Sequence, residues 1–310
     1  MMAPLLAASH GEPATSGARE PRDPKRAARR RDGAAVKPSE TPAPAAGVDV
    51  GATLTKLALP EDSGCRLETV PSERSHEVRA ALADHRAARI GITGAGATQL
   101  AAELGGAVVA VDEFRAWERG VRLLLPEAEE RYLLVSIGTG TSVVHVDGDR
   151  VQRVGGTPLG GGTILGLGTA LTGSSDFDRL CALAGAGDRA RVDVSVAELY
   201  AGNEAPLATD VMASSFARLA AGPLRRDPRP EDLARSLMAM VGENVALLAG
   251  SLSLWLGVES ILFGGSTLRG NPALREAVSD YVARFGRTAV HLDSGAFAGA
   301  LGARRVAASG

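Results

Sequence analysis

Two glycine-rich turns lie close together in residues 135–168, whose sequence is VSIGTGTSVVHVDGDRVQRVGGTPLGGGTILGLG. In the first of them, SIGTGTS, Gly138 and Gly140 free the backbone to approach an anion closely, because neither carries a side chain. Thr139 and Ser142 add hydroxyl donors beside those glycines. This combination of small residues and hydroxyls predicts a phosphate-binding loop.

A second candidate phosphate loop, DVGATLTK, occurs earlier in the chain. The backbone N–H groups of Gly51, Ala52 and Thr53 can converge on a phosphate, because the side chains there are small. Asp49, at the end of the preceding predicted strand, is suited to holding Mg²⁺ through water. Lys56 offers a compact positive charge and is the only lysine after residue 37. An ordinary hairpin turn would explain this segment, taken alone, equally well.

The third glycine-containing loop is ILFGGST, in which a predicted buried strand runs into Gly264 and Gly265. Two glycines there would let a flat ring lie against the backbone, and Ser266 could hydrogen-bond to the edge of that ring. A strand that ends in two glycines is common, so this loop alone indicates little. Together, however, the three loops have the order and spacing of the phosphate and adenosine loops of the actin-like ATPase superfamily.

A fourth glycine-rich stretch, GITGAGATQLAAELGGAVVAVDE, resembles a dinucleotide-binding fingerprint. It has Gly94, Gly96 and an acidic residue further on, Asp112. Gln99 stands at the third glycine position, where a long side chain would prevent close packing of helix against strand. A nicotinamide cofactor would also leave the other three loops unexplained, and we do not favour it.

Composition excludes several classes of protein. The net charge of −2 provides no general attraction to nucleic acid or to an anionic membrane. The two cysteines, Cys65 and Cys181, are far apart and lack metal-binding spacing, so we expect a reduced, intracellular and cytoplasmic protein. The longest apolar segment, around residues 231–256, is interrupted by polar residues and has apolar residues on one helical face. That pattern favours a buried core helix over a membrane span.

The elements that would position these loops begin after a tail. Residues 1–45 are rich in Pro, Ala and Arg without hydrophobic periodicity, which predicts disorder. From there strands and helices alternate, as in an α/β protein. Two predicted hairpins, GVDVGATLTKLAL and YLLVSIGTGTSVVHVDG with Asp147-Gly148 at the turn after it, would each begin one lobe. We therefore expect an N-terminal lobe over residues 46–130 and a C-terminal lobe over residues 131–306.

A kinase of this kind also needs a base near the acceptor hydroxyl. The segment AVVAVDEF, read as a strand, offers Asp112 and Glu113. Alternation along a strand would send the two carboxylates to opposite faces, and the pattern alone does not decide which of them faces the cleft.

At this point the residues resemble one family, the type II (eukaryotic-type, Fumble-like) pantothenate kinases. The resemblance covers nearly all of the chain after the tail. It rests on DVGATLTK, ITGAGA, DEF, SIGTGTS, RVGGTPLGGGTILGLGTALTG, GDR, VMASSFARL, ILFGGSTL and GAFAGALGA, in that order. The element RVGGT-x-x-GGGT-x-x-GL is the most specific of these.

The resemblance implies a two-lobed actin-like ATPase fold, a duplicated ribonuclease H-like α/β fold that binds the nucleotide in the cleft between its lobes. It implies ATP and Mg²⁺ as cofactors, pantothenate as the acceptor, a homodimer, and CoA or acyl-CoA as candidate regulators. Glu113 takes the place of the family's general base, and Thr139, Ser142 and Arg153 fall on its substrate contacts. The implied ATP and phosphate site comprises Asp49 (toward Mg²⁺), Gly51, Ala52, Thr53, Leu54, Lys56, Gly138, Thr139, Gly140, Gly161, Gly162, Thr163, Ile164, Leu165, Phe177, Gly264, Gly265 and Ser266.

Two departures from the family pattern stand out: Ala52 replaces a glycine of the first loop, and Pro158 precedes the GGGT cluster. Neither change removes a catalytic group. Two alternative functions remain open from the residues alone. The first is an actin-like kinase for another small hydroxylated acceptor, pantetheine-like or a sugar, and the second is a regulator without enzymatic activity. Retention of Asp49, Lys56 and Glu113 argues against the regulator.

Overall fold

The computed structural model describes residues 44–62, 64–106, 108–200, 211–220 and 227–309. The predicted tail, residues 1–45, therefore lies outside the described residues except for its last two positions. The fold described below belongs to the unit Pro42–Gly310.

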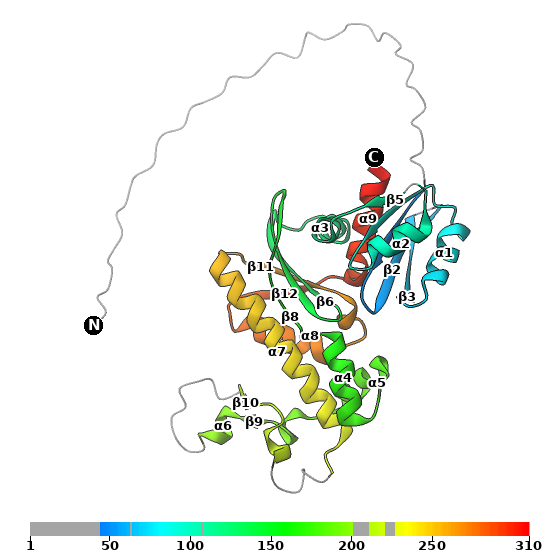
Figure 1. The fold of residues 1–310 in the computed structure, drawn as a ribbon. Helices are drawn as coiled ribbons and strands as arrows, with labels where there is room; N and C mark the ends of the chain where they lie inside the picture. Colours follow the sequence, from blue (N-terminus) through cyan, green and yellow to red (C-terminus); the bar gives the residue numbers. More distant parts are fainter. Residues whose placement is uncertain (1–43, 63, 107, 201–210, 221–226, 310) are drawn as a thin grey trace, which may run out of the picture. The chain divides into compact units, whose positions relative to one another are not determined.

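Two five-stranded sheets form the framework, and the second repeats the strand order of the first (Figure 1). The first sheet contains, in spatial order, β3 (Gly64–Pro71), β2 (Leu54–Glu61), β1 (Ala45–Val50), β4 (Arg89–Thr93) and β5 (Val108–Ala110). The second contains β8 (Arg150–Thr157), β7 (Thr141–Asp147), β6 (Arg131–Ile137), β11 (Ser260–Gly264) and β12 (Thr288–His291).

Each sheet consists of three antiparallel strands followed by two strands parallel to the first. β1 pairs antiparallel with β2 and parallel with β4, and β6 pairs in the same two ways with β7 and β11. The second sheet is thus a duplicate of the first, strand for strand, and the expected duplicated α/β fold is confirmed.

The predicted hairpins form where the sequence indicates them. In the register of β7 and β8, Asp147 pairs with Arg150, so the two-residue loop is Gly148-Asp149, one residue later than the expected Asp147-Gly148. Gly148 has a φ of 57°, which glycine adopts without the steric penalty of a side chain.

Helices on the outer side of the second sheet build the largest core. They are α4 (Gly161–Thr172), α5 (Phe177–Ala186), α7 (Pro230–Leu256) and α8 (Pro272–Ala283). Leu237 and Val241 of α7 are fully buried in one cluster with Leu133 and Val135 of β6. By length and composition α7 could cross a membrane, but much of it is buried inside the protein, as expected for a core helix.

Smaller elements complete the unit. Helices α1 (Ser75–Asp84) and α2 (Ala97–Leu104) cover the first sheet through the cluster that contains Val78, Leu82 and Leu100. The segment between α5 and α7 contains η1 (Arg189–Arg191), β9 (Val194–Ser195), α6 (Val196–Leu199), β10 (Met212–Ser214) and η2 (Ala217–Ala220). After β11 come η4 (Ser266–Leu268) and, before the last helix, η5 (Gly295–Phe297).

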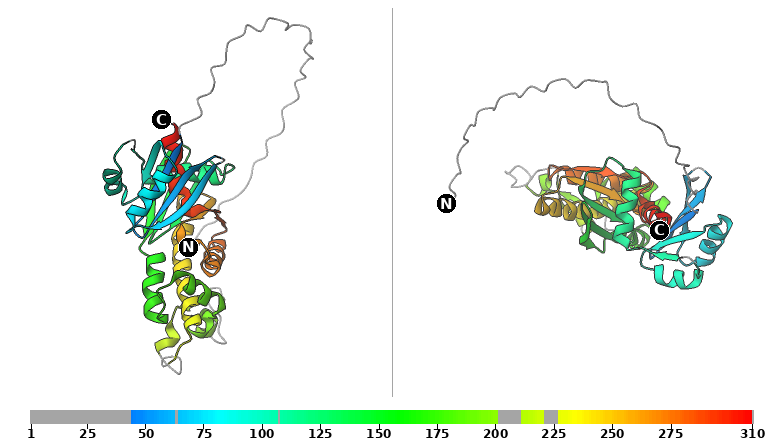
Figure 2. Two further views of the ribbon diagram at one scale, coloured as in Figure 1. Left: turned by 90° about the vertical axis from the view of Figure 1, so that its right-hand side faces the viewer. Right: turned by 90° about the horizontal axis from the view of Figure 1, so that it is seen from above.

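Two helices, α3 (Glu113–Leu124) and α9 (Ala298–Ser309), lie side by side between the sheets (Figures 1 and 2). α3 follows the first sheet, yet its Val121 packs in a cluster with Tyr132 and Leu134 of the second sheet. α9 follows the second sheet but packs against β1 and β4 of the first. Each lobe therefore supplies the helix that covers the other lobe's sheet.

Glycine is needed where α3 and α9 meet. A Cβ on Gly302 would collide with the backbone carbonyl of Ala116 and would lie 2.9 Å from the nitrogen of Gly120. A Cβ on Gly120 would in turn collide with the carbonyl of Ala298. Because these neighbours are backbone atoms, a side chain at either position could fit only if the helices moved apart.

We therefore predict that Gly302→Ala lowers the free energy of unfolding by about 1–3 kcal/mol, the usual cost of overpacking a close-packed interior. Gly166→Ala is the matched control, because Gly166 is also helical and a Cβ there would meet open space. That change should raise the free energy of unfolding by about 0.5–1 kcal/mol through helix propensity. Urea unfolding of both variants measures the difference, and equal stability of the two would contradict the close contact.

Candidate functional site

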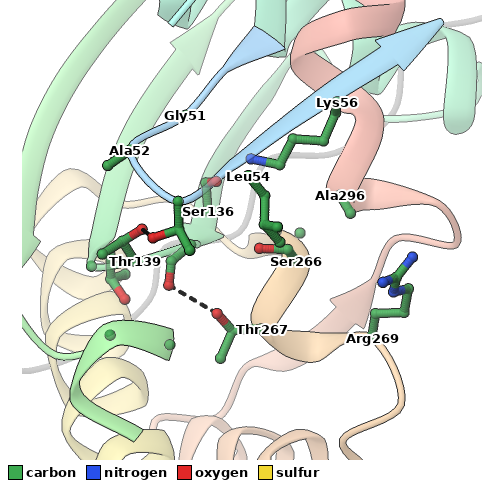
Figure 3. Close-up of a pocket in the computed structure, with 18 of the residues that line it drawn as sticks. Gly51, Ala52, Leu54, Lys56, Ser136, Thr139, Ser266, Thr267, Arg269 and Ala296 are labelled. Atoms are coloured by element: carbon green, nitrogen blue, oxygen red, sulfur yellow. Dashed lines mark hydrogen bonds between the residues drawn. The ribbon is translucent and has the colours of Figure 1, made fainter. Parts of the chain in front are cut away.

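A cleft of about 680 Å³ is lined by residues from both sheets and from α3, α4, α5 and α9 (Figure 3). It gathers most of the site residues that the sequence indicated, from segments that are far apart in the chain. Those that line it are Asp49, Gly51, Ala52, Thr53, Leu54, Lys56, Glu113, Gly138, Thr139, Gly140, Ser142, Gly161, Gly162, Leu165, Phe177, Gly264, Gly265 and Ser266.

Three predicted site residues are not among those that line the cleft. Ile164 faces the core beneath α4 and is fully buried there. The hydroxyl of Thr163 donates to the carbonyl of Pro158 at 3.0 Å. The glycine cluster begins the helix α4, and consecutive residues of a helix point in different directions. Residues 161–165 therefore cannot all face the cleft. Arg153, the third, is described below.

Hydrogen bonds join the three glycine loops directly. The hydroxyls of Thr53, in the first phosphate loop, and Thr139, in the second, lie 3.0 Å apart (Figure 3). The hydroxyl of Thr267, at the end of the third loop, donates to the carbonyl of Gly138 at 2.8 Å (Figure 3). The first of these bonds joins the two lobes, and the second joins two loops of the C-terminal lobe that are far apart in sequence.

The GGGT cluster packs the start of α4 onto the second phosphate loop. The N–H groups of Gly161 and Gly162 donate to the carbonyls of Gly138 and Thr139 at 2.7 and 2.9 Å. A Cβ on Gly160 would lie 2.8 Å from the carbonyl oxygen of Thr139. Because these two N–H groups already donate to acceptors inside the protein, they are not free to bind a ligand. The glycines instead leave space for a ligand, because they carry no side chains.

Glycine is also required in the third loop. Gly265 has a φ of 104°, and a Cβ there would collide with the backbone of Ile137 in β6. The carboxyl end of β11 can therefore turn close beside the end of β6, which places Ser266 on the cleft wall near Ala296 (Figure 3).

The apparent dinucleotide fingerprint has a packing role instead. Gly94 has a φ of 93°, and a Cβ there would lie 2.7 Å from Oδ1 of Asp49. A Cβ on Gly96 would lie 2.5 Å from Cγ1 of Val50. Both glycines thus make room for the end of β1, on which the first phosphate loop depends.

Asp49 is a buried carboxylate at the floor of the cleft, with 6% of its surface exposed. Burial raises its pKa, while the charge of Lys56 and a hydrogen bond from the side chain of Trp117 act in the opposite direction. Lys56 is its direct partner in the register of β1 and β2. A charged carboxylate therefore depends here on its cationic and hydrogen-bonding neighbours.

The two candidate bases differ in a way that the sequence analysis did not anticipate. The strand β5 ends at Ala110, so the expectation that Asp112 and Glu113 alternate along a strand was wrong. Asp112 is the exposed N-cap of α3, and its Oδ1 accepts from the N–H groups of Phe114 and Arg115 at 3.1 and 3.0 Å. A short polar side chain before a helix satisfies otherwise unpaired N–H groups, and this local preference ended the strand early.

Glu113 is the first residue of α3, is half-buried, and lines the cleft. Its pKa is raised, first by burial and then by the negative charges of Asp49 and Asp112, while Lys56 and Arg153 lower it. A carboxylate of raised pKa in a cleft beside phosphate loops has the properties expected of a proton acceptor.

Arg153 reaches the site through Ser142. Its Nε lies 3.4 Å from the Ser142 hydroxyl, which lines the cleft, and its charge acts on Glu113. Arg153 therefore lies at the margin of the cleft, near enough for its charge to act on Glu113.

Sequence reasoning missed several residues that line the cleft, among them Trp117, Asp176, Asp178 and Arg269. Trp117 lies one helical turn after Glu113 on α3, so a correct helix start would have placed both on one face. Asp176 caps α5, where it accepts from the N–H of Arg179. Arg269 follows the third loop, close to Ala296 (Figure 3).

Within the described residues no group of three or more His, Cys, Asp or Glu side chains gathers as a metal cage. One buried carboxylate, Asp49, beside phosphate loops nevertheless fits Mg²⁺, which proteins commonly hold through one or two carboxylates, water and substrate phosphates.

Solved structures with the same fold bind nucleotides. An activator of 2-hydroxyisocaproyl-CoA dehydratase from Clostridium difficile, with bound ADPNP, matches with a TM-score of 0.61 at 18% identity, over 86% of this chain and 94% of that one. A ROK family glucokinase from Streptomyces griseus, in complex with glucose and AMPPNP, matches with a TM-score of 0.54 at 15% identity, over 86% and 100% of the two chains. At these identities the likeness shows the actin-like ATPase fold alone.

Sequence comparison goes further. The Fumble family model matches residues 127–305. The type II pantothenate kinase of Staphylococcus haemolyticus is 34% identical over 260 residues, which cover 83% of this chain and 97% of that protein. The enzyme of the same name from Staphylococcus aureus (strain USA300) is 31% identical with the same coverage. On the strength of these matches, the chain belongs to the Fumble family of type II pantothenate kinases.

Proposed function

We propose that this protein transfers the γ-phosphoryl group of ATP to the primary hydroxyl of pantothenate. The product is 4'-phosphopantothenate, and the reaction is the first committed step of coenzyme A biosynthesis. The observation that carries the proposal is the arrangement of Glu113 in one cleft with two phosphate loops that hydrogen-bond to each other. Membership of the Fumble family identifies the acceptor class.

The nucleotide would lie across the cleft, with its phosphates between the loops that contain Gly51 and Gly138. The hydroxyls of Thr53 and Thr139 face each other there and can each donate to a phosphate oxygen. Gly264, Gly265 and Ser266 would hold the adenosine end. Lys56 supplies the positive charge nearest to Asp49 and would balance charge on the phosphates.

Glu113 would accept the proton of the pantothenate hydroxyl as that oxygen attacks the phosphorus atom. Phosphoryl transfer relies mainly on positioning and charge stabilisation, so the base needs only to lie within reach of the hydroxyl and to be ionised. Ser142, which lines the same cleft, and Arg153, whose charge acts on Glu113, would hold the acceptor. Thr139 would contact both the acceptor and the phosphate.

Asp49 would hold Mg²⁺ through water, and the metal ion would neutralise charge on the phosphate oxygens. The proposal also includes a homodimer and a cytoplasmic location. Both cysteines are free, which is consistent with a reducing compartment.

An ATP-coupled assay that offers pantothenate, pantetheine and glucose side by side tests the proposed acceptor. We expect turnover with pantothenate and none with glucose. Turnover with glucose but not with pantothenate would assign the cleft to a sugar kinase instead. Preference for pantetheine would keep the family and change the physiological acceptor.

We predict that Glu113→Gln lowers kcat by about 10²–10⁴, because the amide keeps the size of the side chain but cannot take the proton. ATP affinity, measured by calorimetry, should be unchanged. Asp112→Asn is the matched control at the adjacent carboxylate: asparagine also caps helices well, so stability and kcat should change little. A low kcat for Asp112→Asn combined with normal turnover of Glu113→Gln would exclude Glu113 as the base.

The pH dependence of turnover should reflect the raised pKa of Glu113. A general base acts only when ionised, so kcat falls as the pH falls through that pKa, and a raised pKa moves this acid limb to higher pH than for an ordinary glutamate. Replacing Lys56 with Met removes a charge that lowers the pKa, so the acid limb should move further up. A pH–rate profile of both proteins checks this, and a limb that stays fixed would mean that another group limits the rate.

A further inference from the structure

The strand β8 contains a bulge next to the candidate acceptor site. In its pairing with β7, Val144 lies opposite Arg153 and Val143 lies opposite Gly155, so Val154 is an extra residue without a partner. A bulge of this kind bends the strand and redirects the neighbouring side chain, and bulges are common beside active sites.

The bulge changes the direction of Arg153. Gln152 and Arg153 are both exposed, which breaks the alternation of a regular strand, and Val154 packs against the core of the second lobe. The guanidinium of Arg153 lies over the backbone of Gly156. A Cβ on Gly156 would collide with Nη2 of Arg153 and would lie 3.1 Å from its Cζ.

The two adjacent glycines of the RVGGT motif have different neighbours. A Cβ on Gly155 would meet the side chain of Leu252 on α7, at 2.8 Å. Gly156 is instead the partner of Ser142 in the strand register, and Ser142 is the residue to which Arg153 donates. The space above Gly156 is therefore filled by the guanidinium and adjoins the cleft.

We propose that Gly156 is a positioning residue for the phosphoryl transfer: together with the bulge at Val154, its missing side chain forms a seat that holds the Arg153 guanidinium beside Ser142. The seat keeps the planar group at the acceptor side of the cleft, where it can make paired hydrogen bonds to an anionic oxygen group. The inference rests on the proposed function only for what Arg153 binds.

Gly156→Ala tests the seat. The methyl group would displace the guanidinium, and we expect kcat/KM for pantothenate to fall by about 10–10²-fold, the scale of a small misplacement in an active site. The KM for ATP should change less than kcat/KM for pantothenate, because the displaced guanidinium lies beside Ser142 and not at the first or third loop. Wild-type kcat/KM for Gly156→Ala would overturn the proposal.

A double-mutant cycle separates positioning from a general structural defect. A Cβ on Gly156 would also lie 2.7 Å from the carbonyl oxygen of Thr141, so the substitution could disturb the pairing of β7 with β8. If Gly156 acts through Arg153, adding Gly156→Ala to Arg153→Ala should cost less than about twofold more in kcat/KM. An equal loss in both backgrounds would mean that the glycine serves strand pairing, and the proposal would be wrong.

Gly155→Ala is the matched control, since it adds the same methyl group one residue away against flexible side-chain atoms. It should show no coupling to Arg153→Ala. The melting temperatures of the same variants give a readout without substrate, so the seat can be tested even if pantothenate is not the acceptor. Folding of Gly156→Ala only in the Arg153→Ala background would support the seat, and failure to fold in both backgrounds would overturn it.

Discussion

The contact between α3 and α9 is the constraint on which the rest of the structure depends. Backbone touches backbone there, through Gly120 against Ala298 and Gly302 against Ala116. α9 lies equally close to the first sheet, where a Cβ on Gly47 would collide with the carbonyl of Ala300. Close packing of this kind leaves no room for adjustment, so the distance between the two helices fixes the distance between the two sheets.

The groups proposed to act in catalysis lie at this contact. Glu113 and Trp117 are on the first turns of α3, and Asp49 ends the β1 strand that α9 covers. The Trp117 ring and the Asp49 carboxylate meet over Gly299, where a Cβ would lie 3.0 Å from Cδ1 of the tryptophan and 2.5 Å from Oδ2 of the aspartate. The proposed base on α3 and the buried carboxylate at the end of β1 are thus held in place by α9, which contributes no side chain at Gly299.

Much of this could be predicted from the sequence, because glycine loops and alternating strands are local signals. The three loops, the core helix α7 and the duplicated α/β pattern were all indicated by residues close together in the chain. The start of α3 was misjudged because the apolar residues of β5 continue into Val111. The capping by Asp112 depends on hydrogen bonds that a pattern of hydrophobicity does not show. The exchange of α3 and α9 between lobes, and the bulge at Val154, are tertiary features without a local signature.

Several glycines that resemble binding residues are explained by packing. Gly94 and Gly96 accommodate the end of β1, and Gly160 and Gly161 accommodate the second phosphate loop and Thr267. A glycine in these motifs can thus be needed for either of two reasons, to leave room for a ligand or to leave room for the neighbouring backbone. The three-dimensional structure distinguishes the two reasons, and the sequence alone does not.

The hydrogen bond between Thr53 and Thr139 has a consequence for nucleotide entry. It is a bond between neutral hydroxyls, which contributes about 0.5–1.5 kcal/mol to stability, whereas a hydroxyl that donates to a charged phosphate oxygen gains roughly twice as much. A phosphate that enters the cleft can therefore replace the hydrogen bond between Thr53 and Thr139 with stronger hydrogen bonds to its own oxygens. Each threonine would then exchange a neutral partner for a charged one, and neither hydroxyl would be left without a hydrogen bond.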